Sequence, residues 1–436
     1  MGRAVQQNLA DHREEGGDQG GAQGDGQEAT HPSTVVAPPA PVAIVRGEEA
    51  YVDLGLTAAQ HELKDELRQY FARLVEEVEG SSDDEPTYTH YIRRMGQDGW
   101  LGLGWPEAYG GQARGPIEQM VFVEESHWAG VPLPLLTLNS VGPTLMALGT
   151  DEQKERILPG ILRGEVHFSI GYTEPSAGTD LASLTTRAVR DGDEYVINGQ
   201  KVFTSAIQYA DYVWLATRTD PDAPKHKGLS VFIVPIDTPG FSWTPLPTMV
   251  GDITSSTFYE DVRVPAENLV GAENQGWKLI TNQLNHERVA ICPASGLLRS
   301  LSEVRHWAQE HRLADGRRVI DQEWVQVHLA RVHAKIEVLK LFNWKVAWAA
   351  DKGLNPADAS ATKVYGTEVA LEIYGLLMEV VGQAGYLAEG SAGAILRGRL
   401  ERNARAQTIF TFGGGANEVQ RDIIAMVGLG MPRAPR

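Results

Sequence analysis

The sequence has very little cysteine and an unequal share of the two charges, and both features limit the class of protein. Its 436 residues include a single cysteine, Cys292. An internal disulfide framework and a cysteine-rich metal site are therefore excluded, and a reducing, cytoplasmic location is expected. Lysine and arginine together number 39 against 57 for aspartate and glutamate, a formal net charge of −18. Nucleic acids and anionic membranes bind basic surfaces, so neither is an expected partner.

The sequence also lacks a long, uninterrupted hydrophobic run. Glu14 and Glu15 stand where the apolar core of a signal peptide would lie. Residues 129–150 are uncharged and long enough to span a membrane, but prolines and glycines interrupt them. We expect a buried irregular segment with a short helix there, and no membrane span. No G-x-G-x-x-G fingerprint follows a predicted strand, and no histidine spacing indicates a metal site, so neither a Rossmann nucleotide site nor a metal centre is expected.

The first part of the chain is polar and its next part is helical. Residues 1–52 are rich in glycine, proline and polar side chains, which predicts a disordered tail. Residues 53–165 form a predicted helical domain. It opens with a capping-box pattern from Thr57 to Gln60, followed by apolar residues at helical spacing.

The second half changes from strands back to helices. Residues 166–275 predict a small antiparallel β domain, a sandwich or barrel, with strands near 212–216, 229–235, 241–245 and 256–262. Residues 276–436 predict a C-terminal helical domain, with helices near 277–311, 320–352, 356–383, 389–404 and 415–427. This α, β, α order predicts the α+β fold class.

The strongest sequence motif lies in residues 167–205. TEPSAGTD, residues 173–180, is dense in glycine, proline and hydroxyls, which indicates a loop that presents backbone groups. NGQKVFTSA, residues 198–206, follows it, and its Asn198-Gly199 pair predicts the type I′ turn of a β-hairpin. Together the two motifs resemble the flavin-binding middle domain of the acyl-CoA dehydrogenases. The likeness extends over residues 54–428.

This resemblance implies that FAD is the cofactor. Backbone groups of Tyr172 and Thr173 would bond the polar edge of the flavin ring, and Ser205 matches another residue that does so. Phe203 stands where the family usually has a tryptophan that covers the ring, and Thr179 matches a hydroxyl residue that meets substrate or flavin. The implied cofactor-binding residues are Tyr172, Thr173, Gly178, Thr179, Phe203, Ser205 and Arg312.

The pyrophosphate element of the family is only partly matched. An arginine from a neighbouring subunit binds this group in the family. Arg312 in HRLADG, residues 311–316, matches it, and Arg317 and Arg318 are alternative candidates. Asp315 replaces the usual phenylalanine before Gly316. An aspartate next to a pyrophosphate would repel it, so this subunit is expected to contribute weakly to its neighbour's flavin.

The position of the catalytic base also departs from the family. Acyl-CoA dehydrogenation needs a carboxylate that removes the proton next to a thioester whose oxygen is polarised by hydrogen bonds. Many members carry the glutamate in a motif similar to EGTSEIQRNIIA, but GGGANEVQRDIIA, residues 413–425, has Gly414 there. Other members use a glutamate in a segment resembling LNHER, residues 284–288, which makes Glu287 the candidate base. The Gly414 N–H can still donate to the thioester oxygen. The alternative is that Glu287 is structural and the subunit is catalytically silent.

A narrower resemblance is to the actinobacterial acyl-CoA dehydrogenases that act on steroid side-chain CoA thioesters. It is carried by GWPEAYGG at 104–111, residues 217–235, NHER and GGGANEVQR. It implies a role in lipid metabolism and steroid catabolism, a homo- or heterotetramer with a paralogous subunit, and electron-transfer flavoprotein as acceptor. An acyl-carrier-protein thioester is an alternative to acyl-CoA. Two other functions stay open, a non-catalytic subunit that completes a paralogue's flavin site and a flavin oxidase or monooxygenase.

Overall fold

The computed structural model describes residues 55–80, 87–281, 283, 292–350, 353 and 355–433. The chain from Leu54 to Arg436 forms one unit. The expected tail, residues 1–52, and the LNHER segment, residues 284–288, lie outside the described residues.

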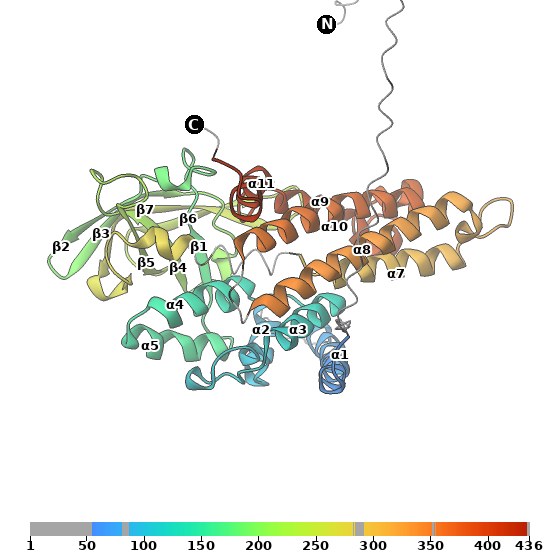
Figure 1. The fold of residues 1–436 in the computed structure, drawn as a ribbon, viewed down its shortest axis with the longest axis horizontal. Coiled ribbons are helices and arrows are strands. Elements are labelled where there is room, and N and C mark those ends of the chain that lie inside the picture. The colour runs from blue at the N-terminus through green and yellow to red at the C-terminus, as the bar shows by residue number, and fades with distance from the viewer. Residues whose placement is uncertain are drawn as a thin grey trace, which may run out of the picture. The chain divides into compact units, whose positions relative to one another are not determined.

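The N-terminal part of the unit is helical, as the sequence predicts. They are α1 (Ala58–Glu79), α2 (Thr87–Gln97), α3 (Pro116–Ala129), α4 (Gly142–Leu148) and α5 (Asp151–Leu162) (Figure 1). The predicted capping box is confirmed, because the Gln60 N–H donates to Thr57 Oγ1 at 3.3 Å and the Thr57 N–H donates to Gln60 Oε1 at 3.0 Å. One face of α1 is buried through Leu63, Leu67, Phe71, Leu74 and Val78.

The uncharged stretch at 129–150 is irregular, as predicted. A π-helical turn, Thr137–Val141, leads directly into α4. Trp105 packs against this turn and donates its Nε1–H to the Leu138 carbonyl at 3.1 Å. Among the helices of the described residues, none is both long and apolar enough to cross a membrane.

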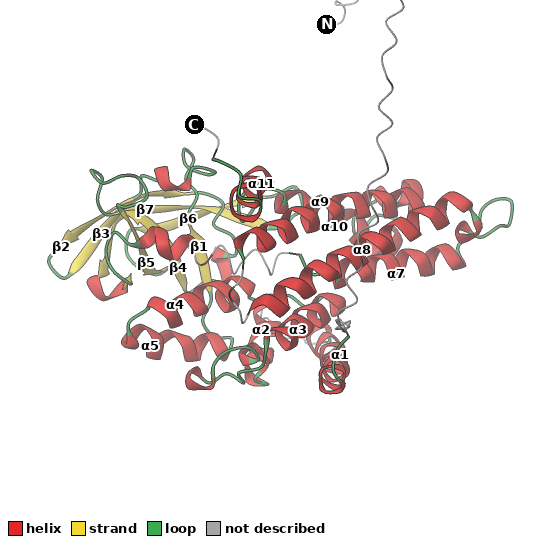
Figure 2. Ribbon diagram, viewed as in Figure 1, coloured by secondary structure: helices red, strands yellow, loops and turns green. Residues whose placement is uncertain are grey.

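The middle of the chain forms a mostly antiparallel sheet, which Figure 2 shows in yellow. The described strands pair in the order β6-β7-β3-β2-β4-β5-β8, and β1 pairs with β4 in parallel. β2 also touches β4 in parallel, while the other neighbours run antiparallel. The strands are β1 (Phe168–Gly171), β2 (Arg187–Asp191), β3 (Glu194–Lys201), β4 (Tyr212–Arg218), β5 (Leu229–Pro235), β6 (Phe241–Pro247), β7 (Ile253–Pro265) and β8 (Leu269–Val270).

The predicted hairpin turn at Asn198-Gly199 is wrong. Both residues lie inside β3, and the turn of the β2–β3 hairpin is at Gly192, where φ is +67°. Gly199 instead marks a bulge in the pairing of β3 with β7. A Cβ at Gly199 would lie 2.6–2.8 Å from atoms of Thr186, so the close approach of the strands explains the glycine.

The C-terminal helices are α7 (Ser295–Glu310), α8 (Glu323–Ala349), α9 (Pro356–Val381), α10 (Arg399–Phe410) and α11 (Asn417–Ile423). The helix predicted at 389–404 begins ten residues late, at Arg399. Gly390, Gly393 and Gly398 adopt positive φ angles of 79°, 83° and 74°, which ends helical geometry before that point.

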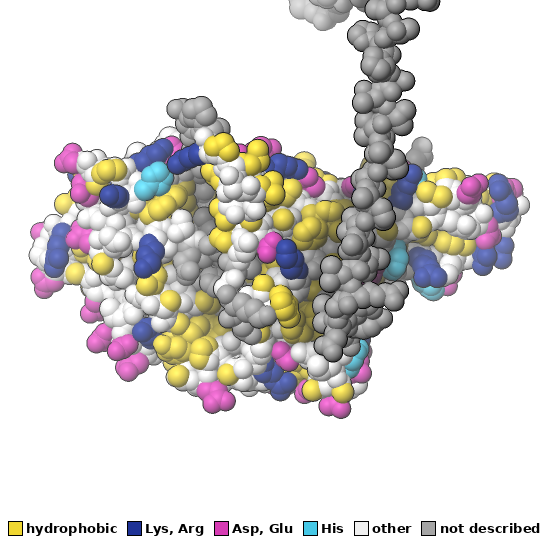
Figure 3. All heavy atoms as spheres, viewed as in Figure 1, with side chains coloured by type: hydrophobic (Ala, Val, Ile, Leu, Met, Phe, Trp, Pro, Cys, Tyr) yellow, Lys and Arg dark blue, Asp and Glu magenta, His cyan; other side chains and the backbone are white. Residues whose placement is uncertain are grey.

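The hydrophobic cores do not follow the three domains predicted from the sequence. One core joins the N-terminal helices to one face of the sheet, through residues such as Phe71, Phe122 and Trp214. The C-terminal helices α7, α8 and α9 enclose a separate core that includes Val304, Ile336 and Ile373. On the face shown in Figure 3, lysine and arginine side chains are scattered among acidic ones rather than gathered in one patch.

Candidate functional site

A buried ion pair fastens the TEPSAGTD loop to the end of β3. The side chains of Glu174, in the loop, and Lys201, in β3, are 3% and 0% exposed. Lys201 Nζ donates to Glu174 Oε1 at 2.9 Å and to the Tyr172 carbonyl at 3.1 Å. The Val202 N–H also donates to the Thr173 carbonyl at 2.8 Å. These contacts connect the TEPSAGTD loop rigidly to the end of β3.

The charges of this pair depend on each other. Burial alone would raise the pKa of Glu174, but the charge of Lys201 and hydrogen bonds from Thr186 lower it to about 2. Burial lowers the pKa of Lys201 to about 8, although the Glu174 carboxylate opposes that effect. Glu174 also accepts hydrogen bonds from both the N–H and the hydroxyl of Thr185. Both groups are charged at neutral pH.

The side chain of Tyr172 points into the protein rather than toward the surface. Tyr172 is 7% exposed, and its hydroxyl accepts a hydrogen bond from Trp214 Nε1 at 3.2 Å. The same hydroxyl donates to Gln283 Oε1. Gln283 stands four residues before Glu287, which lies outside the described residues, so its role as base stays a prediction.

Beyond β3 the chain turns the Phe203 ring outward. Phe203 and Ala206 have φ angles of +62° and +61°, a conformation that costs about 1–2 kcal/mol for a residue with a side chain. Thr204 between them is buried, and its N–H donates to the Ser255 carbonyl at 2.9 Å. This anchor holds the strained turn and leaves Phe203 64% exposed. An exposed ring on a rigid turn is a suitable wall for a flat cofactor.

The polar groups beside Phe203 fit the edge of a flavin. Ser205 is exposed, with Oγ 3.2 Å from Thr254 Oγ1, and Thr173 is half-buried in the fastened loop. Gly178 and Thr179 are exposed farther along that loop. The Glu174–Lys201 pair and the Val202–Thr173 hydrogen bond thus bring Thr173 close to the 203–205 turn. These hydroxyls, an exposed aromatic face and a fixed backbone are what binding of an isoalloxazine ring requires.

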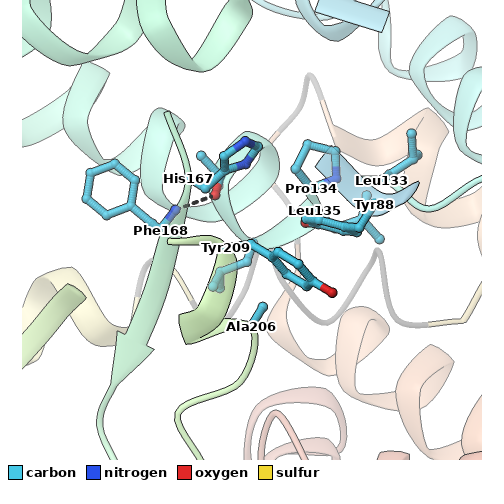
Figure 4. Close-up of a pocket in the computed structure, with 10 residues that line it drawn as sticks. Tyr88, Leu133, Pro134, Leu135, His167, Phe168, Ala206 and Tyr209 are labelled. Atoms are coloured by element: carbon cyan, nitrogen blue, oxygen red, sulfur yellow. Dashed lines mark hydrogen bonds between the residues drawn. The ribbon is translucent and has the colours of Figure 1, made fainter. Parts of the chain in front are cut away.

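A cavity of about 150 Å³ opens next to this turn (Figure 4). Its walls are mostly apolar and aromatic, lined by Tyr88, Leu133, Pro134, Leu135, Leu136, Thr137, His167, Phe168, Ala206 and Tyr209. The rings of Tyr88 and Tyr209 stack with centroids 5.0 Å apart. Burial lowers the pKa of His167, and its Nδ1 has no hydrogen-bond partner among the described residues. Burial therefore keeps this imidazole neutral at neutral pH.

Gly414 lies in a glycine turn between α10 and α11. Gly414 and Gly415 have φ angles of +66° and +99°. The Gly413 N–H donates to the Ile409 carbonyl at 2.7 Å, while the Gly414 N–H bonds to no described residue. The backbone donor predicted for a thioester oxygen is therefore compatible with this turn.

Arg312 lies far from the residues above, in the connection between α7 and α8. Figure 1 shows this connection at the opposite end of the C-terminal helices from the sheet. Arg312 Nη1 donates to the Gly316 carbonyl at 2.8 Å. Asp315 is paired with Arg317 at 2.7 Å, so part of the repulsion predicted for Asp315 is neutralised within the loop. Arg312 therefore lies away from the TEPSAGTD loop and the 203–205 turn of its own chain.

Sequence reasoning missed two buried lysines. Lys201 could have been found, because the alternation of Tyr195 and Ile197 in β3 places residue 201 on the same inward face. Lys363, in α9, is fully buried and contacts the glycine turn. Nothing in the local pattern of an amphipathic helix predicts that contact.

Helices, a mostly antiparallel sheet and an exposed aromatic platform at the sheet are together the features of an α+β flavoenzyme. Family models match three consecutive parts of the chain. They are the acyl-CoA dehydrogenase N-terminal domain at residues 57–165, middle domain at 169–262 and C-terminal domain at 274–429. The chain belongs to the acyl-CoA dehydrogenase family of FAD-dependent oxidoreductases.

Several proteins are similar to this chain over most of its length. The acyl-CoA dehydrogenase FadE26 of Mycobacterium tuberculosis is 58% identical over 398 residues, 88% of this chain and all of that protein. A chain of the ChsE4-ChsE5 complex from the same organism is 60% identical with a TM-score of 0.83, over 87% of this chain and 99% of that one. A chain of the Tcur3481-Tcur3483 steroid ACAD is 50% identical with a TM-score of 0.82, covering 88% and 100%.

Proposed function

We propose that this chain catalyses α,β-dehydrogenation of a bulky acyl-CoA thioester such as a steroid side-chain thioester. The observation that supports it best is the platform of Phe203 and Ser205, fastened through Lys201 to the TEPSAGTD loop. FAD, when bound, supplies the acceptor for the hydride that leaves the β carbon. The remaining chemistry belongs to the chain: holding the thioester, polarising its carbonyl and removing the α proton.

We assign removal of the α proton to Glu287 and polarisation of the thioester carbonyl to Gly414. Glycine has no side chain that can take a proton, so Gly414 serves through its N–H, directed at the thioester oxygen. The Glu287 carboxylate removes the α proton and becomes neutral, while the hydride leaves the adjacent carbon, which balances the formation of the double bond. Gln283, four positions earlier in the sequence, accepts a hydrogen bond from the hydroxyl of Tyr172, which precedes the TEPSAGTD loop.

The cavity beside Ala206 suits the far end of the acyl group. It is lined mainly by aromatic and aliphatic side chains, and the ring of His167 is also part of its wall. At about 150 Å³ it is smaller than pockets that enclose a whole ligand, which measure about 300–1,000 Å³. It therefore takes one end of the acyl group and leaves the thioester at the platform.

We further propose a tetramer that includes a paralogous subunit, and electron-transfer flavoprotein as the acceptor of the electrons. The ChsE4-ChsE5 complex and the Tcur3481-Tcur3483 steroid ACAD, which contain chains similar to this one, each combine two different proteins. Arg312 lies away from the platform of its own chain, which favours a role toward a neighbour's flavin pyrophosphate. We place the enzyme in the cytoplasm, where its one free thiol, Cys292, stays reduced.

The decisive experiment is Glu287→Gln in the chain co-purified with its paralogue. We expect the variant to keep its yellow flavin and to lose bleaching by acyl-CoA under anaerobic conditions. Glu107→Gln, at an exposed position, is the matched control and should behave as the wild type. Full activity of the Glu287 variant would refute the assignment of the base.

A second candidate function is that of a silent subunit that completes a paralogue's flavin site. The absence of a carboxylate at Gly414 favours it. A panel of straight-chain, branched and steroid side-chain acyl-CoAs separates the two functions. If no thioester bleaches the flavin of the complex, or if only paralogue mutations abolish bleaching, the silent role is correct. Oxygen consumption during turnover would instead indicate an oxidase.

A further inference from the structure

Lys363 of α9 is a fully buried cation that binds the segment between α10 and α11. It is 0% exposed, and Nζ donates to the Gly415 carbonyl at 2.8 Å, the Thr411 carbonyl at 3.2 Å and Asn417 Oδ1 at 2.7 Å. An ammonium has three donors, and three oxygens receive them. A buried charge is tolerated only when it is bonded in this way, so the cation and the oxygens determine each other's positions.

The position of the cation suits the C-terminal end of α10. Thr411 is the C-terminal cap of α10, and Asn417 is the first residue of α11. The last carbonyls of a helix carry a partial negative charge that favours a cation. Lys363 therefore closes the C-terminal end of α10 and ties it to the start of α11 across the turn.

The glycine turn is held at both sides of Gly414. On one side the Gly413 N–H donates to the Ile409 carbonyl at 2.7 Å, and on the other the Gly415 carbonyl accepts from Lys363. Two consecutive glycines at positive φ would otherwise be free to rotate. With these two bonds made, the direction of the Gly414 N–H is fixed.

The anchor itself is rigid. The amide of Asn417 donates to Thr367 Oγ1 and to Glu368 Oε1, each at 3.0 Å. Arg421 in turn pairs with Glu368 at 2.7 Å. The oxygen that receives Lys363 is therefore held by a network that spans α9 and α11.

We propose that Lys363 is a positioning residue for the dehydrogenation, because it aims the Gly414 N–H at the thioester oxygen. The inference rests on the proposed function of Gly414. Loss of an oxyanion donor lowers rates by about 10²–10³, and displacement of such a group by about 1 Å lowers them by about 10². We expect loss of the Lys363 ammonium to weaken removal of the α proton by roughly 10- to 100-fold.

The test measures the α-proton acidity of a bound probe in the flavin-loaded complex. A 3-thia-acyl-CoA can lose its α proton to the base but does not transfer hydride, and its anion gives a long-wavelength charge-transfer band with the flavin. In Lys363→Met, the pH midpoint of this band should rise by about one to two pH values, matching the 10- to 100-fold loss. Binding of the neutral probe and the flavin content should stay within about twofold of the wild type.

Lys335→Met is the matched control. Lys335 pairs with Glu372 at 2.8 Å between α8 and α9, and its side chain is 30% exposed. The control should leave the midpoint unchanged. If Lys363→Met has the same midpoint as the control, the inference is wrong. If the wild type itself never deprotonates the probe, the proposed function fails instead.

A second variant covers loss of folding in Lys363→Met. Asn417→Ala keeps the cation but removes one of its acceptors, so the ammonium can shift away from the Gly415 carbonyl. We expect a rise of the midpoint in the same direction and faster amide exchange of residues 411–417. Unchanged exchange and an unchanged midpoint in Asn417→Ala would overturn the inference.

Discussion

Removal of one partner of the Glu174–Lys201 pair should destabilise the protein far more than removal of both. The fall of the Glu174 pKa from 4.5 to about 2 corresponds to about 3 kcal/mol in favour of the folded state, at ~1.36 kcal/mol for each tenfold change. The fall of the Lys201 pKa from 10.5 to about 8 is similar in size and unfavourable. The pair as a whole therefore adds little to stability, but an unpaired member is costly.

The magnitude follows from the burial of both groups. Their side chains are 3% and 0% exposed, so water cannot replace the missing partner. We expect Glu174→Gln and Lys201→Met each to lower the free energy of unfolding by roughly 3–5 kcal/mol, as for other broken buried pairs. The double variant should lose clearly less than the sum, because it leaves no buried charge.

The assay is urea unfolding at pH 7, followed by far-UV circular dichroism and by release of flavin fluorescence. Lys225→Met is the control, because Lys225 pairs with Asp180 of the same loop but both side chains are about half exposed. That change should cost at most about 1 kcal/mol. The reasoning is refuted if Glu174→Gln costs no more than the control, or if the two single effects simply add in the double variant.

Low pH should destabilise the protein because it protonates the Glu174 carboxylate. Because the folded-state pKa of Glu174 is lowered, its stabilisation is complete above pH 4.5 and is lost as the pH falls through about 2. Unfolding free energy measured across that window should therefore fall more steeply in the wild type than in Glu174→Gln. Equal slopes would contradict the assignment.

Three other outcomes can be checked directly. Phe203→Ala should weaken FAD binding by about two- to tenfold in a flavin titration of the apoprotein, without altering the far-UV spectrum, because the lost aromatic contact is worth about 0.5–1.5 kcal/mol. Burial raises the pKa of the Cys292 thiol to about 12, so a thiol reagent at pH 8 should label it only after unfolding; rapid labelling of the native protein would be inconsistent with this burial. Gly96→Ala should lower the melting temperature by several degrees, because a Cβ there would lie 2.2 Å from the Arg163 carbonyl carbon; an unchanged melting curve would argue against that close packing.

Local patterns predicted most of the helices and strands. The capping box at Thr57 and the apolar spacing of α1 are properties of neighbouring residues, so sequence alone sufficed. The class of enzyme and its cofactor came from the TEPSAGTD and NGQKVFTSA motifs through their resemblance to a family. The catalytic and cofactor-binding residues assigned from that resemblance are predictions that measurements of function will test.

The errors arose where distant contacts decide between local signals. Asp191-Gly192 and Asn198-Gly199 are both good turn dipeptides, and only the pairing of β3 with β7 places the second inside a strand. The bond from Lys363 to Gly415 joins residues 52 positions apart, so no local window contains both partners. Helices and strands can therefore be predicted from local sequence, whereas contacts between distant residues such as Lys363 and Gly415 cannot.

The shared core between the N-terminal helices and the sheet has a consequence for dissection of the protein. Three domain models match along the chain, but one continuous apolar core includes Phe71, Phe122 and Trp214 from the first two. An expression boundary at about residue 166 would expose that core on both fragments. A boundary after Ile280 leaves it whole, because Leu279 and Ile280 are the last residues along the chain that it includes. The hydrophobic cores therefore group the N-terminal helices with the sheet, which carries the Phe203 turn. They place the C-terminal helices, which carry the glycine turn, in a second group.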